Sequence, residues 1–305
     1  MPVQSARRSQ PRRVVGLGEA LWDFLPEGKQ IGGAPLNFAY ISLLLGEQAI
    51  IASRIGADRL GAELERELSE RGIEIGHLQH DTSLPTGAVR VMISADGQPH
   101  YEIARPVAWD ALESTSDWEE LARQADAVCF GTLAQRSEQS RKAIAAFLRA
   151  TRPGCIRIFD VNLRPPFYSR DTVLDSIRLA TIVKFNEKEL SEVNTMMGIP
   201  VCASPQDVRT LATHLGVELI CVTRGDRGSL LATPQQVVEH PGFPVRVVDT
   251  VGAGDAFAAA VACCWGLRVG LERTSVVANL WAGWVASQPG AMPRIDDVRR
   301  REMLP

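Results

Sequence analysis

One segment near the end of the chain combines glycines and acids in a pattern that suits phosphoryl chemistry. Residues 249–257 read Asp-Thr-Val-Gly-Ala-Gly-Asp-Ala-Phe, and the apolar stretch that follows predicts a helix from the glycines to about residue 265. The unpaired amides of Gly252, Ala253 and Gly254, with the positive end of the helix dipole, would bind an anion. Asp255 is then either a dipole-stabilising residue or a base that takes the proton of a hydroxyl attacking phosphorus.

Two common phosphate-binding motifs are absent from the sequence. A P-loop needs a lysine after its last glycine, whereas Asp255 follows Gly254. A dinucleotide-binding loop would begin at Gly16 and Gly18, but Leu21 occupies the third glycine position. The expected anion site is therefore of another kind.

A second group of candidate residues follows the first predicted strand. Asp23 stands just past that strand, where a carboxylate either accepts hydrogen bonds from sugar hydroxyls or remains a solvated loop residue. Gly32 and Gly33 precede a predicted helix start that contains Asn37. There the backbone can approach a polyol closely, and the amide of Asn37 can both donate and accept hydrogen bonds.

The elements that must position these residues alternate short apolar runs with amphipathic stretches. Asp58 and Ser137 each precede a helix with apolar residues at helical spacing. The alternation predicts an α/β fold with a doubly wound, mostly parallel sheet, helices on both faces, and ligands beyond the carboxyl ends of the strands. The predicted strands are 14–17, 49–53, 127–130, 156–160, 182–185 and 219–223.

Two segments, 22–31 and 86–107, break the alternation. They read as short strands of an antiparallel β-flap, or lid, with a turn at Asp96 and Gly97 and no covering helix. The lid would expose an apolar face unless it closed over a ligand or paired with a second copy, so we expect a homodimer through the lid. Arg105 is expected to contact substrate when the lid is closed.

The composition excludes several other classes of protein. The chain has 305 residues, of which 45% are hydrophobic, and its net charge is −3, so it offers no general positive field for nucleic acid or a membrane surface. Residues 1–12 form a basic tail that we expect to be disordered, and 13–305 form one domain. The longest apolar run, 256–267, is too short to cross a bilayer, and the first 13 residues lead us to expect no secretory signal, because they contain no apolar stretch. Six cysteines without zinc spacing indicate reduced core residues in a cytoplasmic protein.

The two groups of candidate residues together carry a family resemblance. A Gly-Gly-x-x-x-Asn near residue 35 and an Asp-Thr-x-Gly-Ala-Gly-Asp near residue 250 resemble the two signatures of the ribokinase-like (PfkB) carbohydrate kinases. Segments 160–164, 184–189, 223–228 and 278–279 stand in the family's order, so the resemblance extends from about residue 14 to 293. It implies a ribokinase-like fold and ATP-dependent phosphorylation of a primary hydroxyl on a small sugar.

The resemblance also implies roles for individual residues. Asp255 would be the general base, and the amides of Gly252, Ala253 and Gly254 would stabilise the transferring phosphoryl group. Arg164 would approach that group or the substrate. The sugar itself would be bound by Asp23, Gly32, Gly33 and Asn37.

The nucleotide and its ions would lie on the other side of the site. Asn186 and Glu189 would organise Mg²⁺ mainly through water, which suits an ion that keeps much of its hydration shell. A K⁺ ion would bind carbonyls of Asp249, Val251 and the stretch 287–290 beside the anion site. The residues that would line the nucleotide site are Thr223, Gly225, Gly228 and Asn279.

The choice of sugar is less sharply indicated. Residues 18–24, 32–39 and 160–164 resemble bacterial fructokinases, which favours fructose, whereas the lid segment 101–110 departs from their usual sequence. Ribose, 2-keto-3-deoxygluconate or a nucleoside are the alternative acceptors. A non-catalytic module that binds sugar and nucleotide is the alternative from another class, and the presence of Asp255 beside an intact glycine run argues against it.

Overall fold

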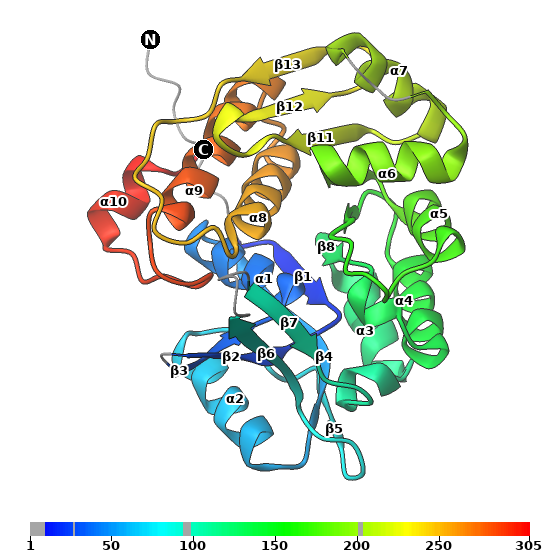
Figure 1. The fold of residues 1–305 in the computed structure, drawn as a ribbon, viewed down its shortest axis with the longest axis vertical. Helices are drawn as coiled ribbons and strands as arrows, with labels where there is room; N and C mark the ends of the chain where they lie inside the picture. Colours follow the sequence, from blue (N-terminus) through cyan, green and yellow to red (C-terminus); the bar gives the residue numbers. More distant parts are fainter. Residues whose placement is uncertain (1–9, 27, 94–98, 201–203) are drawn as a thin grey trace.

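A nine-stranded sheet forms the centre of the molecule (Figure 1). The computed structural model describes residues 10–26, 28–93, 99–200 and 204–305. The strand order is β13-β12-β11-β10-β9-β8-β1-β4-β5, parallel from β11 to β5, with β12 and β13 antiparallel at one edge. The strands are β1 (Arg13–Leu17), β4 (Gln48–Gly56), β5 (Leu78–Asp81), β8 (Ala127–Phe130), β9 (Ile156–Asp160), β10 (Ile182–Asn186), β11 (Leu219–Thr223), β12 (Ser229–Ala232) and β13 (Val237–His240).

Helices cover both faces of this sheet, as the sequence predicts. One face packs against α1 (Ala34–Leu44), α2 (Arg59–Glu70), α8 (Ala253–Gly266) and α9 (Leu271–Ala286). The other packs against α3 (Ser116–Gln124), α4 (Glu138–Ala150), α5 (Arg170–Leu179), α6 (Glu187–Met197) and α7 (Pro205–Leu215). Three single-turn helices, η1 (Ala108–Ala111), η2 (Leu133–Gln135) and η3 (Gly225–Arg227), and the terminal α10 (Asp297–Glu302) complete the fold.

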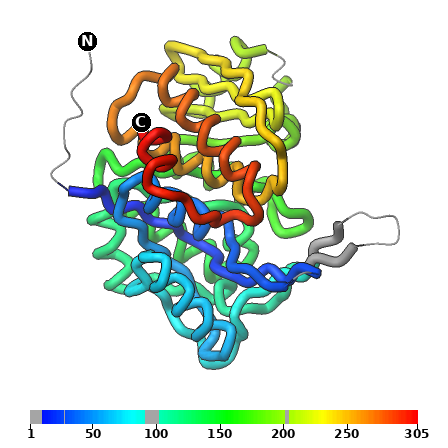
Figure 2. Tube along the Cα trace, turned by 90° about the vertical axis from the view of Figure 1, so that its left-hand side faces the viewer, coloured from blue at the N-terminus to red at the C-terminus, as the bar shows by residue number. Residues whose placement is uncertain are grey.

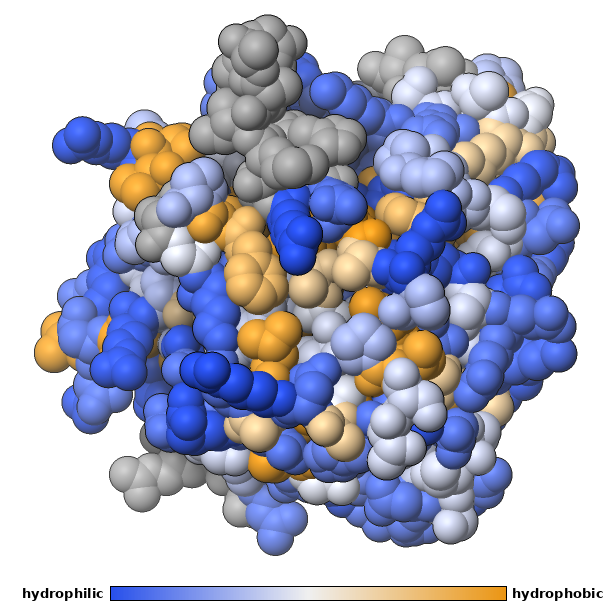
Figure 3. Space-filling model, turned by 60° about the horizontal axis from the view of Figure 1, so that its bottom comes forward, coloured by the Kyte–Doolittle hydropathy of each residue, from blue (hydrophilic) through white to orange (hydrophobic). Residues whose placement is uncertain are grey.

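Side chains on the strands divide between two hydrophobic cores. Val14 and Ile51 belong to the core under α1 and α8, whereas their chain neighbours Val15 and Ile50 belong to the core under α3 to α7. This alternation follows from the two-residue period of a strand. On the face shown in Figure 3, surface apolar residues occur in small groups between hydrophilic ones. All six strands predicted from the sequence are present, each within a residue or a few of its expected bounds.

The predicted helix caps are also confirmed. The Asp58 carboxylate accepts a hydrogen bond of 2.8 Å from the amide of Gly61, and the Ser137 hydroxyl accepts one of 3.1 Å from Ser140. Each side chain therefore satisfies an amide that the helix itself leaves unpaired.

The lid is a separate four-stranded sheet in the order β3-β2-β6-β7, and Figure 2 shows it to one side of the main body. Its strands are β2 (Leu21–Leu25), β3 (Gly28–Gly32), β6 (Gly87–Ile93) and β7 (Pro99–Ile103). The expectation of an antiparallel flap is wrong for one pair, because β2 and β6 run parallel. Between them the chain passes through β3, α1, β4, α2 and β5, and such a long crossover allows two strands to pair in the same direction. The turn predicted at Asp96 and Gly97 lies outside the described residues.

Arg12 belongs to the folded domain, which corrects the expected end of the basic tail. Its guanidinium forms an ion pair of 2.6 Å with the buried Glu47 and donates to the carbonyls of Ala262 and Cys263 near the end of α8. A cation at a helix C-terminus is favoured by the helix dipole. Residues 1–9 of the predicted tail lie outside the described residues.

Five of the six cysteines lie in the described residues, where all five are buried free thiols, as predicted. Cys202 lies outside that part of the chain. No helix among the described residues is long and apolar enough to span a bilayer.

Candidate active site

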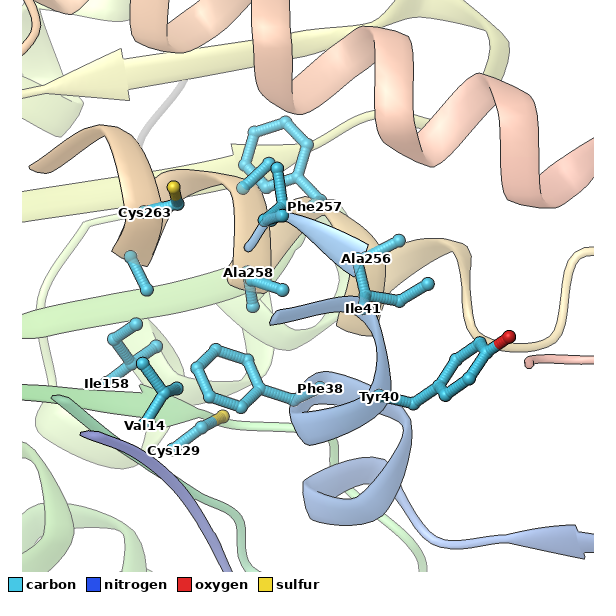
Figure 4. Close-up of a cluster of buried hydrophobic side chains, with 14 of the residues drawn as sticks. Val14, Phe38, Tyr40, Ile41, Cys129, Ile158, Ala256, Phe257, Ala258 and Cys263 are labelled. Atoms are coloured by element: carbon cyan, nitrogen blue, oxygen red, sulfur yellow. The ribbon is translucent and has the colours of Figure 1, made fainter. Parts of the chain in front are cut away.

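The first turns of two helices meet at the candidate site. The side-chain nitrogen of Asn37, in α1, donates a hydrogen bond of 2.8 Å to the carboxylate of Asp255, in α8. Figure 4 shows the packing behind this contact, with Ile41 of α1 beside Ala256 and the ring of Phe38 on the side of Ala258, both in the alanine-rich α8. Small side chains allow close approach of the helices, so the predicted sugar-binding and phosphate-binding motifs form one site.

The glycine run before Asp255 forms a left-handed turn into α8. Gly252 has φ +80°, and a Cβ on it would lie 2.5 Å from the side chain of Ala291, so no other residue fits there without movement. Within the described parts of the chain, the amides of Gly252 and Gly254 have no hydrogen-bond acceptor. The Ala253 amide is partly used, in a long bond of 3.3 Å to the carbonyl of Thr250. Two of the three predicted amides are therefore fully available to an anion.

A buried ion pair lies beneath this glycine run. Lys184 and Asp160 are paired neighbours on β10 and β9, and the lysine nitrogen contacts the two carboxylate oxygens at 2.8 and 3.0 Å. A Cβ on Gly254 would lie 3.1 Å from the same nitrogen. Burial lowers the pKa of Lys184, but Asp160 and Glu189 outweigh it, and its pKa is raised overall. A permanent positive charge therefore stands beside the open amides.

Sequence reasoning did not assign a role to Lys184 or Asp160, although a signal was present. A lysine inside an otherwise apolar parallel strand must be paired once the strand is buried. An aspartate ending the preceding predicted strand is the natural partner, because the carboxyl ends of parallel strands share one edge of the sheet.

Asp255 is partly buried, and its surroundings adapt it to accept a proton near neutral pH. Burial, and next the charge of Asp160, raise the pKa of Asp255 to about 6, against the opposing effects of the Asn37 hydrogen bond and of Lys184. A carboxylate with this pKa is ionised at pH 7 and is still basic enough to bind a proton. Beside an anion-binding turn, it is placed to deprotonate an alcohol as negative charge arrives.

The predicted sugar-binding residues form the wall between the lid and α1. Asp23 lies on β2, and a Cβ on Gly32 would lie 2.1 Å from one of its carboxylate oxygens, so the carboxylate packs directly over that glycine. Gly33 has φ +114°, which favours glycine, and a Cβ there would meet the carbonyl of Glu19 at 2.5 Å. Burial raises the pKa of Asp23 to about 6, with Arg164 opposing the shift.

Glu19 is a further buried acid that sequence reasoning passed over. Its side chain is enclosed below the start of α1, where it accepts a hydrogen bond from the amide of Ala34. Burial is the main cause that raises the pKa of Glu19 to about 7, and the charge of Asp255 adds to it. One oxygen of Glu19, and the side-chain oxygen of Asn37, have no hydrogen-bond partner among the described residues. The only sequence signal was a charged residue directly after a buried strand.

The two predicted arginines are not equally close to Asp255. Arg164 is exposed at a turn after β9, and its charge lowers the pKa of both Asp23 and Asp255, so it faces the site. Arg105 follows β7 and is exposed, and its guanidinium lies 5.5 Å from the ring centre of Phe167. No contact recorded for the described residues joins Arg105 to Asp23 or Asp255.

Asn186 and Glu189 form a capping box at the start of α6. The Asn186 side chain accepts from the Glu189 amide at 2.9 Å, and Glu189 accepts from the amides of Asn186 at 2.8 Å and Leu163 at 3.2 Å. Both carboxylate oxygens of Glu189 are thus occupied. No three His, Cys, Asp or Glu side chains among the described residues are grouped to hold a metal. These residues fit a Mg²⁺ held through water and phosphates rather than in a protein cage.

The residues predicted for the nucleotide lie at the far end of the same sheet edge. Thr223 ends β11 and donates to the carbonyl of Phe185 at 3.3 Å. Gly225 and Gly228 both have positive φ, and a Cβ on Gly228 would lie 2.1 Å from the carbonyl of His240. Asn279 is buried on α9 and donates to the Ser229 hydroxyl at 2.7 Å. The contact of Gly228 with His240 and the hydrogen bond of Asn279 to Ser229 are both explained by packing within the fold, so neither contact by itself indicates a nucleotide site.

Asp249 connects the two loops predicted to hold a monovalent cation. Its carboxylate accepts from the amide of Val251 at 2.9 Å and from that of Gly290 at 3.1 Å. The 249–251 and 287–290 backbones are therefore held together beside the start of α8.

Comparison with known proteins agrees with this geometry. The profile described as pfkB family carbohydrate kinase matches residues 27–297. Fructokinases of Klebsiella pneumoniae and Escherichia coli are 31% and 30% identical to the chain, each over 87% of this chain and 86% of the relative. The structure of an uncharacterized sugar kinase from Pyrococcus horikoshii in complex with ATP superposes with a TM-score of 0.78 at 27% identity, over 96% of this chain and all of that one.

The fold, the glycine run before Asp255 and these matches define a phosphotransferase that acts on an alcohol group. The chain belongs to the pfkB family of carbohydrate kinases.

Proposed function

We propose that this protein transfers the γ-phosphoryl group of ATP to a primary hydroxyl of fructose. The observation that carries the proposal is the position of Asp255, a partly buried carboxylate with a raised pKa, between Asn37 and the open amides of Gly252 and Gly254. Fructose is favoured because the fructokinases of two bacteria are about 30% identical to the chain. ATP is favoured by the ATP complex of the 27% identical sugar kinase.

In the proposed mechanism, Asp255 takes the proton of the acceptor hydroxyl as its oxygen attacks the γ-phosphorus in line. The amides of Gly252 and Gly254 stabilise negative charge on the transferring phosphoryl group. The amide of Ala253 joins them once its long hydrogen bond to Thr250 breaks. Lys184 adds a fixed positive charge on the same side, and Asn37 holds the Asp255 carboxylate in position. The proton stays on Asp255 until it passes to solvent, and ADP departs from the side of phosphorus opposite the attacking oxygen.

The sugar is held by Asp23, Asn37 and the backbone of Gly32 and Gly33, with Arg164 beside the reacting centre. Arg105 would have to move from Phe167 to reach the acceptor, so we place it in the closed lid. The acceptor lies under the lid, where water is excluded and electrostatic interactions are stronger.

Mg²⁺ is proposed to bind through water near Asn186 and Glu189, where it neutralises charge on the nucleotide phosphates. The residues proposed to surround the nucleotide are Thr223, Gly225, Gly228 and Asn279. Carbonyls of Asp249 and Val251 are the proposed K⁺ ligands, because the Asp249 carboxylate already holds the two loops together. A homodimer through the lid and a cytoplasmic location remain parts of the proposal.

An acceptor panel tests the choice of substrate. Purified protein with ATP and Mg²⁺ is offered fructose, ribose, 2-keto-3-deoxygluconate and a purine nucleoside, and ADP formation is measured. We expect fructose to give the highest kcat/KM. A higher value for the sugar acid or the nucleoside would replace fructose while leaving the kinase assignment intact. Binding of ATP and sugar without ADP production would instead support the non-catalytic module.

A further inference from the structure

Two adjoining cavities lie on the α4–α5 side of the molecule, and neither is lined by Asp23, Asn37 or Asp255. The larger, of about 690 Å³, lies between the end of the lid, the start of α4 and the loop that leads into α5. The smaller, of about 410 Å³, continues between α4 and α5. Gln135 and Arg141 line both, so the two cavities form one continuous site.

The lining of this site has a surplus of positive charge. It contains six basic and three acidic side chains, in a chain whose net charge is −3. Each acid already has a basic partner, in the pairs Asp110 with Arg136 at 2.7 Å, Glu138 with Lys142 at 2.7 Å and Asp175 with Arg178 at 2.6 Å. Among the described residues, Arg105, Arg141 and Arg149 have no ion-pair partner. Three guanidinium groups therefore remain for an anion from outside the chain.

Arg136 shows that the larger cavity is built rather than accidental. Its side chain is only 6% exposed, and the carbon of its guanidinium lies 3.9 Å from the ring centre of Trp109 and 4.9 Å from that of Phe167. It donates to Asp110 and to the carbonyl of Ala104, yet its Nη1 has no partner within the described residues. Because Nη1 is enclosed by protein atoms, the role of Arg136 is to fix the cavity wall, where it holds the end of the lid at Ala104 against Asp110 of η1.

Two helix N-termini add to the same field. Ser137 and Ser169, the N-caps of α4 and α5, both line the larger cavity. The helices have 13 and 10 residues, so each presents open amides and the positive end of a dipole. The aromatic rings of Phe167 and Tyr168 provide an apolar wall beside these groups.

We infer that the joined cavities bind a small bisphosphorylated sugar, with one phosphoryl group in each cavity. Arg105 would serve the larger cavity while its guanidinium lies against Phe167, as it does in this structure, whereas Arg149 would serve the smaller cavity and Arg141 both. Arg141 and Arg149 are eight residues apart on α4, which at 1.5 Å per residue separates their backbones by about 12 Å. That separation suits a ligand charged at both ends and is too long for one phosphate ion.

The site is connected to the reaction centre through two of its walls. Arg105 stands at the end of the lid, and the amide of Phe167 donates at 2.7 Å to the carbonyl of Arg164. A bound ligand would therefore hold the lid end and the Arg164 turn together, which makes the site regulatory. This inference does not depend on which sugar is phosphorylated.

Titration calorimetry of the full chain with fructose 1,6-bisphosphate tests the inference, because this probe has no free primary hydroxyl and cannot act as an acceptor. We expect one binding site that persists in saturating fructose and ADP, and at least tenfold weaker binding in Arg141→Glu and in Arg149→Glu. Arg66→Glu, the same charge change on exposed α2, should bind like the unchanged protein. Melting temperatures establish that each variant is folded, and the two arginine variants are independent of each other.

Four results would overturn the inference. These are no binding of the probe, binding in both arginine variants as tight as in the unchanged protein, displacement of the probe by fructose with ADP, and inorganic phosphate that binds as tightly as the probe. Displacement would assign the probe to the reaction centre, and equal phosphate binding would remove the sugar from the assignment.

Discussion

Asn37 and Asp255 are 218 residues apart in the sequence, yet a hydrogen bond of 2.8 Å joins their side chains. Each lies in the first turn of a buried helix, so the bond connects the sugar side of the site to the phosphate side. It also lowers the pKa of Asp255 against the larger opposing effect of burial. Asn37 is thus expected to set the protonation of the base as well as to contact sugar.

Asn37→Ala should move the pH dependence of the reaction. Without the hydrogen bond the pKa of Asp255 rises further, so the acid limb of kcat/KM, expected near pH 6, should shift to higher pH. Profiles between pH 5 and 8 for both proteins measure the shift. A reduced but unshifted profile would limit Asn37 to sugar binding.

Asp255→Asn should stabilise the folded protein while removing its base. Because the folded pKa of about 6 lies above the ordinary 3.8, Asp255 contributes stability that is present below pH 4 and lost as the pH rises through 6. The shift corresponds to about 3 kcal/mol at 1.36 kcal/mol per pKa unit. Thermal unfolding should show a higher Tm for the variant at pH 8 and a vanishing difference at pH 4.

Asp297→Asn, on the exposed start of α10, is the control for that comparison. Its Tm should follow that of the unchanged protein at both pH values. If Asp255→Asn proved less stable at pH 8, the carboxylate would be stabilised by its neighbours more than it is penalised by burial.

The glycines at 252 and 254 should respond differently to alanine. Gly252→Ala forces a Cβ to within 2.5 Å of Ala291 at φ +80°, so we expect lower stability and loss of activity. Gly254→Ala meets the end of the Lys184 side chain, with the added Cβ 3.1 Å from Nζ and 3.5 Å from Cε, so its Tm should change little while kcat falls about tenfold or more as the charge moves. Equal Tm losses in the two variants would indicate that the Lys184 side chain cannot move away from the added methyl group.

Glu19 should tolerate neutralisation but not truncation. Its pKa of about 7 means that the side chain is partly protonated at neutral pH, so Glu19→Gln, of nearly the same shape, should be as stable as the parent protein or more so at pH 8. Glu19→Ala leaves the buried amide of Ala34 without its partner, which costs about 1–3 kcal/mol. Denaturant unfolding distinguishes them, and an unstable glutamine variant would show that the negative charge itself is required.

Much of the fold follows from local sequence patterns. Apolar runs separated by capped helices such as those at Asp58 and Ser137 leave few arrangements other than a parallel sheet covered on both faces. The parallel pairing of β2 and β6 was missed because strand direction depends on the whole crossover between them, which no short segment records.

Site residues could be predicted from the sequence where the site requires a backbone conformation that only glycine adopts easily. Gly252 and Gly33 stand where positive φ and close contacts exclude other residues, and such positions appear in sequence as glycine runs. The pairing of Lys184 with Asp160, and the burial of Glu19, depend on neighbours brought together by the sheet. The convergence of Arg105, Arg136 and Arg141 likewise has no local signature.

Turnover of Asp255→Asn with ATP and fructose is the most direct test of the central claim that Asp255 removes the proton from the acceptor. The account predicts that kcat falls by roughly 10²–10⁴ while the KM values change only a few-fold, since the neutral side chain can still accept from Asn37. A variant that retained the full kcat would contradict the account.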